Sequence, residues 1–228
     1  MNKNILAFVI ALFLASSSYS VYAVGTANAG KTKAASCAGC HGEQGNSMMP
    51  MFPKIAGQHP KYVINQLLAF KEGTRKNATM APMAMGLSNE DMADIAAFYA
   101  EQQISSNELP VINQDDEDDE EEESGNNDDI EKPDINALIK QGSDLYRNGD
   151  LKSEVSACIA CHGPSGEGNK PAAFPALRSQ HADYLIQSLS DYKSGARVSS
   201  NSNMMHMIAK KMSDEEIRAV SYYISMMK

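Results

Sequence analysis

The chain has 228 residues, a formal net charge of −9 and four cysteines. The length allows two small domains, and four cysteines are too few for a dense disulfide framework. Thirteen of the 29 acidic residues lie between positions 113 and 134, so the remaining sequence is close to neutral and has no basic stripe. This pattern excludes a typical nucleic-acid-binding module.

Residues 1–23 are typical of a secretory signal peptide. Lys3 precedes an apolar run from Ile5 to Leu14, and a small-residue stretch ends at Ala23. The run of ten residues is about half of what a membrane-spanning helix needs. We therefore expect a periplasmic protein, cleaved after Ala23 or alternatively after Ala29, and a permanent anchor is the weaker interpretation.

The first domain is predicted to span residues 24–112. It contains Cys37-Ala38-Gly39-Cys40-His41, a C-x-x-C-H motif that indicates c-type haem attachment. Cys37 and Cys40 have the spacing that forms thioethers with the two vinyl groups of one haem, and His41 then ligates the iron. Apolar periodicity and a Ser-x-x-Asp cap predict helices over residues 32–40 and 61–72 and a last helix that begins at Ser88.

Residues 113–134 are predicted to form an extended acidic linker. They hold nine consecutive acids, from Asp115 to Glu123, and almost nothing apolar to bury. A solubilising spacer is the first interpretation. Docking of a basic partner and binding of cations are the alternatives.

The second domain, residues 135–228, carries a second motif, Cys158-Ile159-Ala160-Cys161-His162. Helices are predicted over residues 135–147 and 182–193, and a last helix begins at Ser213 with a capping box to Glu216. The two halves form an internal repeat at one shared offset. The matched positions are Phe52-Pro53 with Phe174-Pro175, Gln58-His59 with Gln180-His181, Tyr62 with Tyr184, Gly73 with Gly195 and Arg75 with Arg197. Neither half has a useful strand pattern, so the fold is predicted to be all-α.

Other interpretations of C-x-x-C are a zinc half-site, a thioredoxin-like redox pair and a structural disulfide, and none of them needs the adjacent His. Zinc prefers four ligands at paired spacing, and a redox pair is expected within a βαβ pattern, which is absent. All four cysteines fall inside the two motifs. Haem attachment is therefore the favoured prediction.

Methionines in the region before each last helix are candidates for the second axial ligand. Met80 and Met205 each stand eight residues before the capping serine, whereas Met83, Met85 and Met204 have no methionine at the matching position. His206 is the alternative to Met205, but its counterpart is alanine. His–Met ligation gives a six-coordinate iron of raised potential.

Other polar residues receive weaker predictions. Arg75 and Arg197, with Tyr62 and Tyr184, are candidates to bind haem propionates, although ordinary solvated or core roles stay open. Pro50 is predicted to supply a carbonyl to the ring of His41. Pro171 is read as a plain turn, and His59 and His181 receive no chemical role.

The chain resembles the cytochrome c4 family of periplasmic di-haem cytochromes c. The resemblance rests on C-A-G-C-H-G, F-P-K-I-A-G-Q-H-P-K-Y, F-K-E-G-T-R-K-N and the segments from Met80 to Ser88 and from Met205 to Ser213. It implies two tandem cytochrome c-type domains, two covalent haem c groups, and His41 with Met80 and His162 with Met205 as axial ligands. The long acidic linker, and Met212 in the place of a usual Leu, depart from the family.

The resemblance implies an electron carrier with no catalytic residue. The expected partners are redox proteins such as a quinol-oxidising complex and a haem-copper terminal oxidase, with peripheral membrane association and no nucleic acid. The alternatives are a haem subunit of a periplasmic oxidoreductase, such as a sulfur-compound dehydrogenase, and a di-haem peroxidase with one open iron.

Overall fold

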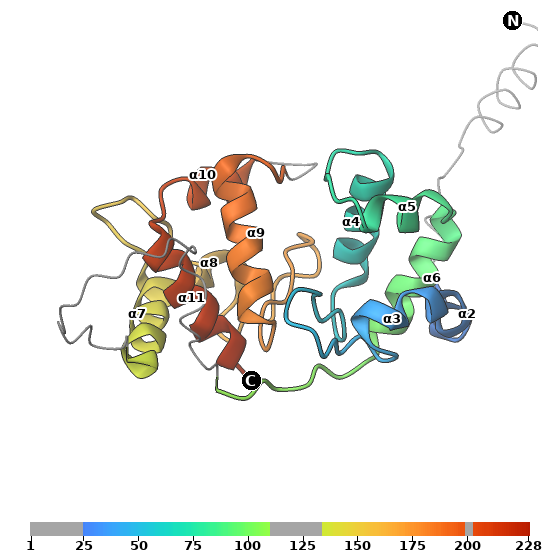
Figure 1. Cartoon of the computed structure of the whole chain (residues 1–228), viewed down its shortest axis with the longest axis horizontal. Coiled ribbons are helices and arrows are strands. Elements are labelled where there is room, and N and C mark those ends of the chain that lie inside the picture. The colour runs from blue at the N-terminus through green and yellow to red at the C-terminus, as the bar shows by residue number, and fades with distance from the viewer. Residues whose placement is uncertain (1–24, 110–133, 199–202) are drawn as a thin grey trace, which may run out of the picture.

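The computed structural model describes residues 25–109, 134–198 and 203–228. These residues form helices joined by loops, as predicted, and within them β-pairing is limited to isolated bridges. Two helical units lie side by side along the long axis, the first coloured blue to green and the second yellow to red (Figure 1). The predicted signal peptide and most of the predicted acidic linker lie outside the described residues.

The first unit contains a short 3₁₀ helix between its first two α-helices. Its elements are α2 (Ala27–Lys33), η1 (Ala34–Ser36), α3 (Ala38–His41), α4 (Pro60–Lys71), α5 (Met80–Met85) and α6 (Asn89–Ala100). Helix α2 packs across α6, and α4 packs on α5 and α6. Ser88 caps α6 in a complete capping box with Asp91, which confirms the predicted Ser-x-x-Asp cap.

The second unit repeats this plan. Its elements are α7 (Ile135–Asn148), α8 (Ile159–His162), α9 (Ala182–Ser194), α10 (Met204–Ala209) and α11 (Asp214–Met226). Helix α7 packs on α11, and α9 packs on α10 and α11. Ser213 and Glu216 form the predicted capping box. The middle and last helices therefore confirm the predictions to within one residue.

Two predictions about local structure were wrong. One helix was expected over residues 32–40, but α2 ends at Lys33 and is followed by η1 and α3. A Cβ on Gly30 would lie 2.0 Å from the carbonyl oxygen of Asp94, so this glycine lets α2 cross α6 at close range. The methionine loops are also partly helical, as α5 and α10. Just before α5, the side chain of Asn77 accepts hydrogen bonds from the backbone N–H groups of Thr79 and Met80.

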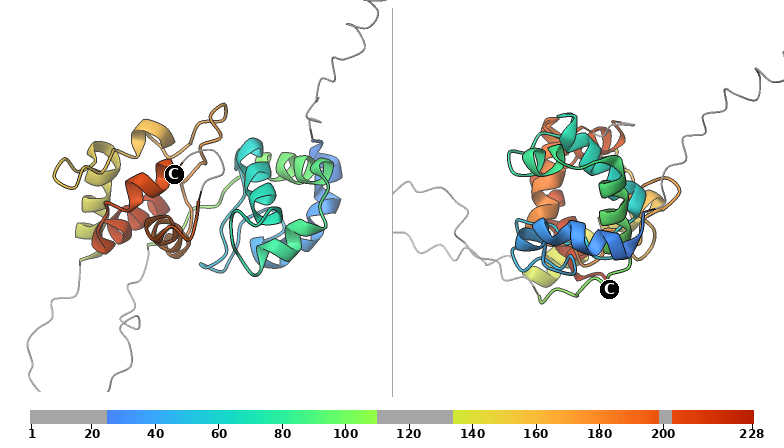
Figure 2. Two further views of the ribbon diagram at one scale, coloured as in Figure 1. Left: turned by 90° about the horizontal axis from the view of Figure 1, so that it is seen from above. Right: turned by 90° about the vertical axis from the view of Figure 1, so that its right-hand side faces the viewer.

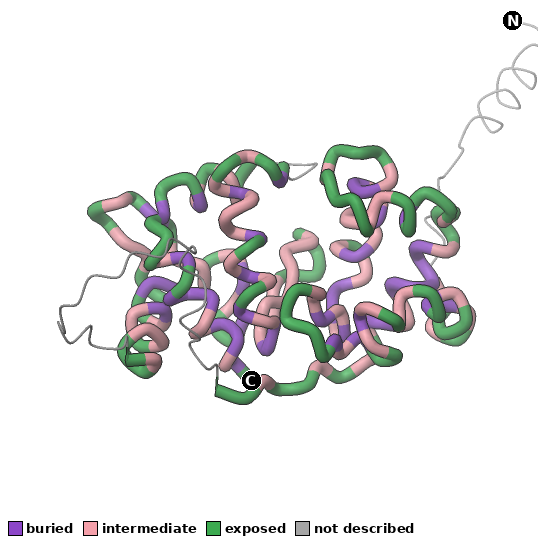
Figure 3. The backbone as a smooth tube through the Cα atoms, in the orientation of Figure 1, coloured by how far each residue is buried: buried purple, intermediate pink, exposed green. Residues whose placement is uncertain are grey.

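Each unit has its own hydrophobic core, visible as the buried inner faces of its helices in Figure 3. In the first unit Val63, Leu67 and Phe70 of α4 are buried together with Met92 and Ala96. In the second the core combines Leu145, Tyr146, Val155, Leu185, Met212, Ile217, Val220, Ile224 and Met227. Separate cores indicate that each unit is a folding domain, which a bound prosthetic group stabilises further.

The two units meet through polar contacts that recur in both directions. The side chain of Gln58 bonds the backbone of Ala176, and the side chain of Gln180 bonds the backbone of Lys54. Since these residue pairs are equivalent in the internal repeat, the interface is an approximate twofold arrangement. Figure 2 shows the two units facing each other across it.

The segment after α6 also joins the units. It runs from the first unit to the second, drawn in green in Figure 1. The amide nitrogen of Asn107 donates to the carbonyls of Ser179, Gln180 and Ser225, at 3.0 to 3.1 Å. The ammonium group of buried Lys54 donates to Ser105 and Asn107 in the same segment. The segment that leaves the first domain is therefore held to both domains by hydrogen bonds.

Candidate functional site

Each C-x-x-C-H motif folds into one short helical turn. Cys37 is the N-cap of α3, and Cys40 and His41 lie within it; Cys158 is likewise the N-cap of α8. Residues three and four positions apart share a helix face, so this turn brings the two thiols and the imidazole together. All four cysteines are free and half-buried. Among the described residues no group of three or more His, Cys, Asp and Glu side chains is arranged to hold a metal ion.

The two imidazoles are buried and oriented alike. Nδ1 of His41 lies 2.8 Å from the carbonyl oxygen of Pro53, and Nδ1 of His162 lies 3.0 Å from that of Pro175. A carbonyl only accepts, so Nδ1 carries the proton and the Nε2 lone pair is left for a metal. Burial lowers the pKa of both rings, although the carbonyl hydrogen bond opposes this shift. Both rings are therefore neutral at neutral pH, as ligation requires.

The prediction that Pro50 supplies this carbonyl was wrong. Pro50 is exposed, whereas Pro53 makes the contact. The reason is the path of the loop, because the carbonyl of Gly45 accepts hydrogen bonds from the backbone of Ile55 and Ala56 and draws the following segment back toward α3. In the second domain the carbonyl of Gly166 accepts the corresponding bonds from the backbone of Leu177 and Arg178. Pro53 and Pro175, which supply the two carbonyls, are therefore equivalent positions of the repeat.

The cysteine environments argue against a redox-active dithiol. Burial raises the pKa of Cys37, and it raises that of Cys158 to about 11. Reactive C-x-x-C pairs have a lowered thiol pKa. A raised thiol pKa at the first cysteine of each motif is the opposite of what disulfide exchange requires, which favours the covalent haem attachment that the motif predicts.

The methionines divide by exposure. Met80 opens α5 and packs partly buried against the core of Val63, Leu67 and Phe70, while Met83 and Met85 are exposed. Met205 is likewise half-buried in α10. Its neighbours Met204 and Met207 are exposed. The two methionines singled out by the repeat are thus the sheltered ones.

His206, the alternative to Met205, is held against α9 through one ring nitrogen. Its Nδ1 lies 2.6 Å from the carbonyl oxygen of Tyr192 in α9. Its ring also lies next to Gly195, at the end of the same helix. These contacts hold the imidazole against the C-terminal end of α9.

Two arginines and two tyrosines, one of each from either domain, form a cluster at the domain interface. Arg75 donates to the hydroxyl of Tyr184, and Arg197 donates to the hydroxyl of Tyr62 and to Gln66, at 3.0 to 3.2 Å. Arg197 is 5% exposed and, among the described residues, neither arginine forms an ion pair with a carboxylate. Although burial raises the pKa of Tyr184, the two guanidinium groups outweigh it and lower that pKa to about 7. The cluster is electropositive and would be stabilised by an anion.

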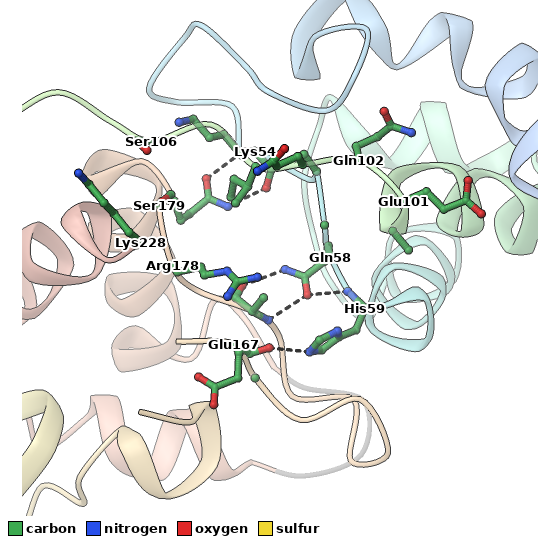
Figure 4. Close-up of a pocket in the computed structure, with 18 of the residues that line it drawn as sticks. Lys54, Gln58, His59, Glu101, Gln102, Ser106, Glu167, Arg178, Ser179 and Lys228 are labelled. Carbon is green, nitrogen blue, oxygen red and sulfur yellow. Dashed lines mark hydrogen bonds between the residues drawn. The ribbon is translucent and has the colours of Figure 1, made fainter. Parts of the chain in front are cut away.

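A polar cleft of about 760 Å³ opens between the domains (Figure 4). Gln58 and His59 reach it from the first domain, and Glu167, Arg178 and Gln180 reach it from the second. Nε2 of His59 lies 2.8 Å from the carbonyl oxygen of Glu167, although no chemical role was predicted for this ring. The available signal was the repeat itself, since Gln58-His59 recurs as Gln180-His181.

No helix among the described residues has the length and apolarity to cross a bilayer. Comparison with known proteins matches the cytochrome c family model to residues 27–102 and 139–228. Cytochrome c4 from Azotobacter vinelandii is 37% identical over 238 aligned residues, covering 98% of each chain. The crystal structure of reduced recombinant cytochrome c4 from Pseudomonas stutzeri superposes with a TM-score of 0.76 at 36% identity, covering 90% of this chain and 100% of that one. The thiosulfate dehydrogenase electron acceptor of Thiomonas intermedia is 30% identical and covers 85% of this chain and 79% of its own.

Proposed function

The chain belongs to the cytochrome c4 family and is a di-haem electron carrier, and from this premise we propose which residues hold each iron and which partners the carrier serves. It carries two haem c groups, one in each cytochrome c domain. Bound haem supplies a reversible one-electron change at iron. The protein's own part is to fix the ligands, exclude water and present the site to a partner.

The proposed attachment and ligation are the same in both domains. Cys37 and Cys40 hold the first haem and Cys158 and Cys161 the second. His41 with Met80, and His162 with Met205, are the axial pairs. The support is the buried imidazole whose Nδ1 is already bonded, leaving Nε2 free, together with the sheltered position of each methionine.

The electropositive cluster is proposed to receive haem propionates. Arg75, Arg197, Tyr62 and Tyr184 supply donors from both domains at one place. Buried Arg197 lacks an acidic partner among the described residues, which favours a ligand that brings negative charge.

We propose that the carrier works in the periplasm, after removal of residues 1–23, and passes electrons from a quinol-oxidising complex toward a haem-copper terminal oxidase. Ala29 lies inside α2, which favours cleavage after Ala23. The domain limits 24–112 and 135–228 and the acidic linker 113–134 belong to this proposal. One relative is named as the electron acceptor of a thiosulfate dehydrogenase, so a sulfur-compound dehydrogenase is a second candidate donor.

The first experiment is a visible spectrum of the purified holoprotein, oxidised and reduced, with and without carbon monoxide. We expect two haem c groups per chain and no change with carbon monoxide, because both axial positions are filled. A shift in half of the haem would contradict one methionine assignment and favour an open, enzyme-like iron. Adding candidate donors and membranes containing the oxidase then tests the partners by the rates of reduction and oxidation.

A further inference from the structure

One peptide group in the first domain lies between the His41 ring and the second domain. Nδ1 of His41 bonds the carbonyl oxygen of Pro53 at 2.8 Å. The N–H of Lys54 belongs to the same peptide unit, and it donates to Oε1 of Gln180 at 2.8 Å. A chain of two hydrogen bonds therefore runs from the imidazole to a side chain of the other domain.

The second domain has the mirror arrangement. Nδ1 of His162 bonds the carbonyl oxygen of Pro175, and the N–H of Ala176 in that peptide unit donates to Oε1 of Gln58 at 3.0 Å. Gln58 and its bonds to the facing backbone are drawn in Figure 4. The internal repeat relates these two series of hydrogen bonds. The same link from a haem-binding histidine to the opposite domain therefore occurs twice, once in each direction.

Both glutamines are held in one orientation. They are buried, at 7% and 6% exposure. Nε2 of Gln58 donates to the carbonyl of Ala176, and Nε2 of Gln180 donates to that of Lys54. Each Oε1 accepts a second bond from the backbone N–H of the following residue, His59 or His181. Two N–H donors converge on each oxygen, which sets the orientation of the amide.

We propose that Gln58 and Gln180 are positioning residues that tune the reduction potential of the haem in the opposite domain. The inference rests on the proposed ligation by His41 and His162. An acceptor on the N–H side of a peptide polarises it and makes its carbonyl a stronger acceptor. A stronger bond to Nδ1–H makes the imidazole a more basic ligand. A more basic ligand stabilises oxidised iron and lowers the potential.

The sign of the effect separates this role from a structural one. Removing the amide of Gln180 should raise the potential of the haem at His41, because its ligand becomes less basic. Loosening the interface would instead admit water, which stabilises the charged oxidised site and lowers the potential. The two causes shift the reduction potential in opposite directions. Loss of tuning affects only the haem of the opposite domain.

The test uses the full-length holoprotein with Gln180→Met and Gln58→Met, which keep side-chain length and remove both amide groups. Redox titration followed by NMR assigns a potential to each haem, and the Nδ1–H resonance of each ligating ring reports its hydrogen bond. We expect Gln180→Met to raise the potential of the haem at His41 and to shift only that ring's Nδ1–H. Gln58→Met should do the same at His162.

Lys61→Met is the matched control, because the ammonium group of Lys61 donates to Pro171 across the interface without touching either peptide unit. It should move neither potential. If a methionine variant does not fold, Gln180→Asn or Gln58→Asn takes its place, because the asparagine side chain is too short to reach the facing peptide. Each should again raise the potential of the haem in the opposite domain. Equal shifts at both haems, a downward shift, or a shift in the variant's own domain would overturn the proposal. Failure of the proposed His ligation is seen separately in the unmodified protein, where the NMR resonances of His41 and His162 would not be those of iron-bound rings.

Discussion

Arg75 and Arg197 form an antiparallel β-bridge with each other across the domain boundary. They are equivalent positions of the repeat, and equivalent residues can pair in this way only near the axis that relates the two halves. Each guanidinium group then reaches the tyrosine of the other domain. The electropositive cluster is therefore a property of the paired domains and not of either alone.

Replacing Met80 or Met205 with alanine should open one iron. Because a thioether ligand raises the potential, each variant should lower the potential of one haem. Carbon monoxide should then bind about half of the reduced haem. Visible spectroscopy and redox titration measure both effects. Exposed Met83→Ala is the control and should behave like the unmodified protein; unchanged ligation in Met80→Ala would rule out that residue.

Arg197→Met should lower the potential of at least one haem and loosen the domain contact. The change removes a buried cation whose charge disfavours the oxidised, more positive iron, and it deletes the bonds to Tyr62 and Gln66. Redox titration at low and high salt measures the effect, and a buried charge should show little screening. Exposed Lys76→Met is the comparison; equal effects from both variants would argue against a specific role for Arg197.

Gly142→Ala should destabilise the second domain by about 1–3 kcal/mol through overpacking. A Cβ at this position would lie 2.0 Å from the carbonyl oxygen of Ala219, where α7 crosses α11. Thermal unfolding of the holoprotein gives the change. Gly86→Ala is the matched control, because its added Cβ meets no atom within 4 Å; comparable losses in the two variants would show that the crossing is not the cause.

Acidification should weaken the domain contact through His59. Burial lowers the pKa of this ring, and nearby Lys170 and Arg178 lower it further, while the bond to the carbonyl of Glu167 opposes them. Its Nδ1 is buried and has no hydrogen-bond partner among the described residues, so a second proton finds no acceptor there. The pKa of this ring is lower in the folded protein than in the unfolded chain, where it is about 6.5. The neutral ring therefore stabilises the fold at pH values above about 6.5, and this contribution is lost as the pH falls below that value.

The check on His59 is the thermal midpoint measured across this pH range. His59→Gln keeps a neutral donor near the Nε2 position but cannot titrate. Its stability should therefore fall less between neutral and mildly acidic pH than that of the unmodified protein. Parallel losses in the two proteins would mean that other groups, such as His181, govern the acid response.

Local chemistry determined most of what the sequence predicted. The C-x-x-C-H spacing predicted both attachment sites because two thiols and an imidazole within five residues share one helical turn. Capping serines and apolar periodicity located the middle and last helices, since those signals act within a few residues. The repeat offset singled out Met80 and Met205 without any structure.

The tertiary structure alone decided the contacts between distant segments. Gly30 permits a close helix crossing, and Pro53 rather than Pro50 meets His41, because the packing of α6 and the folding of a loop set those distances. The roles of Gln58 and Gln180 depend on bonds between residues more than a hundred positions apart. Such bonds form only when two folded domains dock, and no local pattern of residues encodes which backbone groups will then face each other.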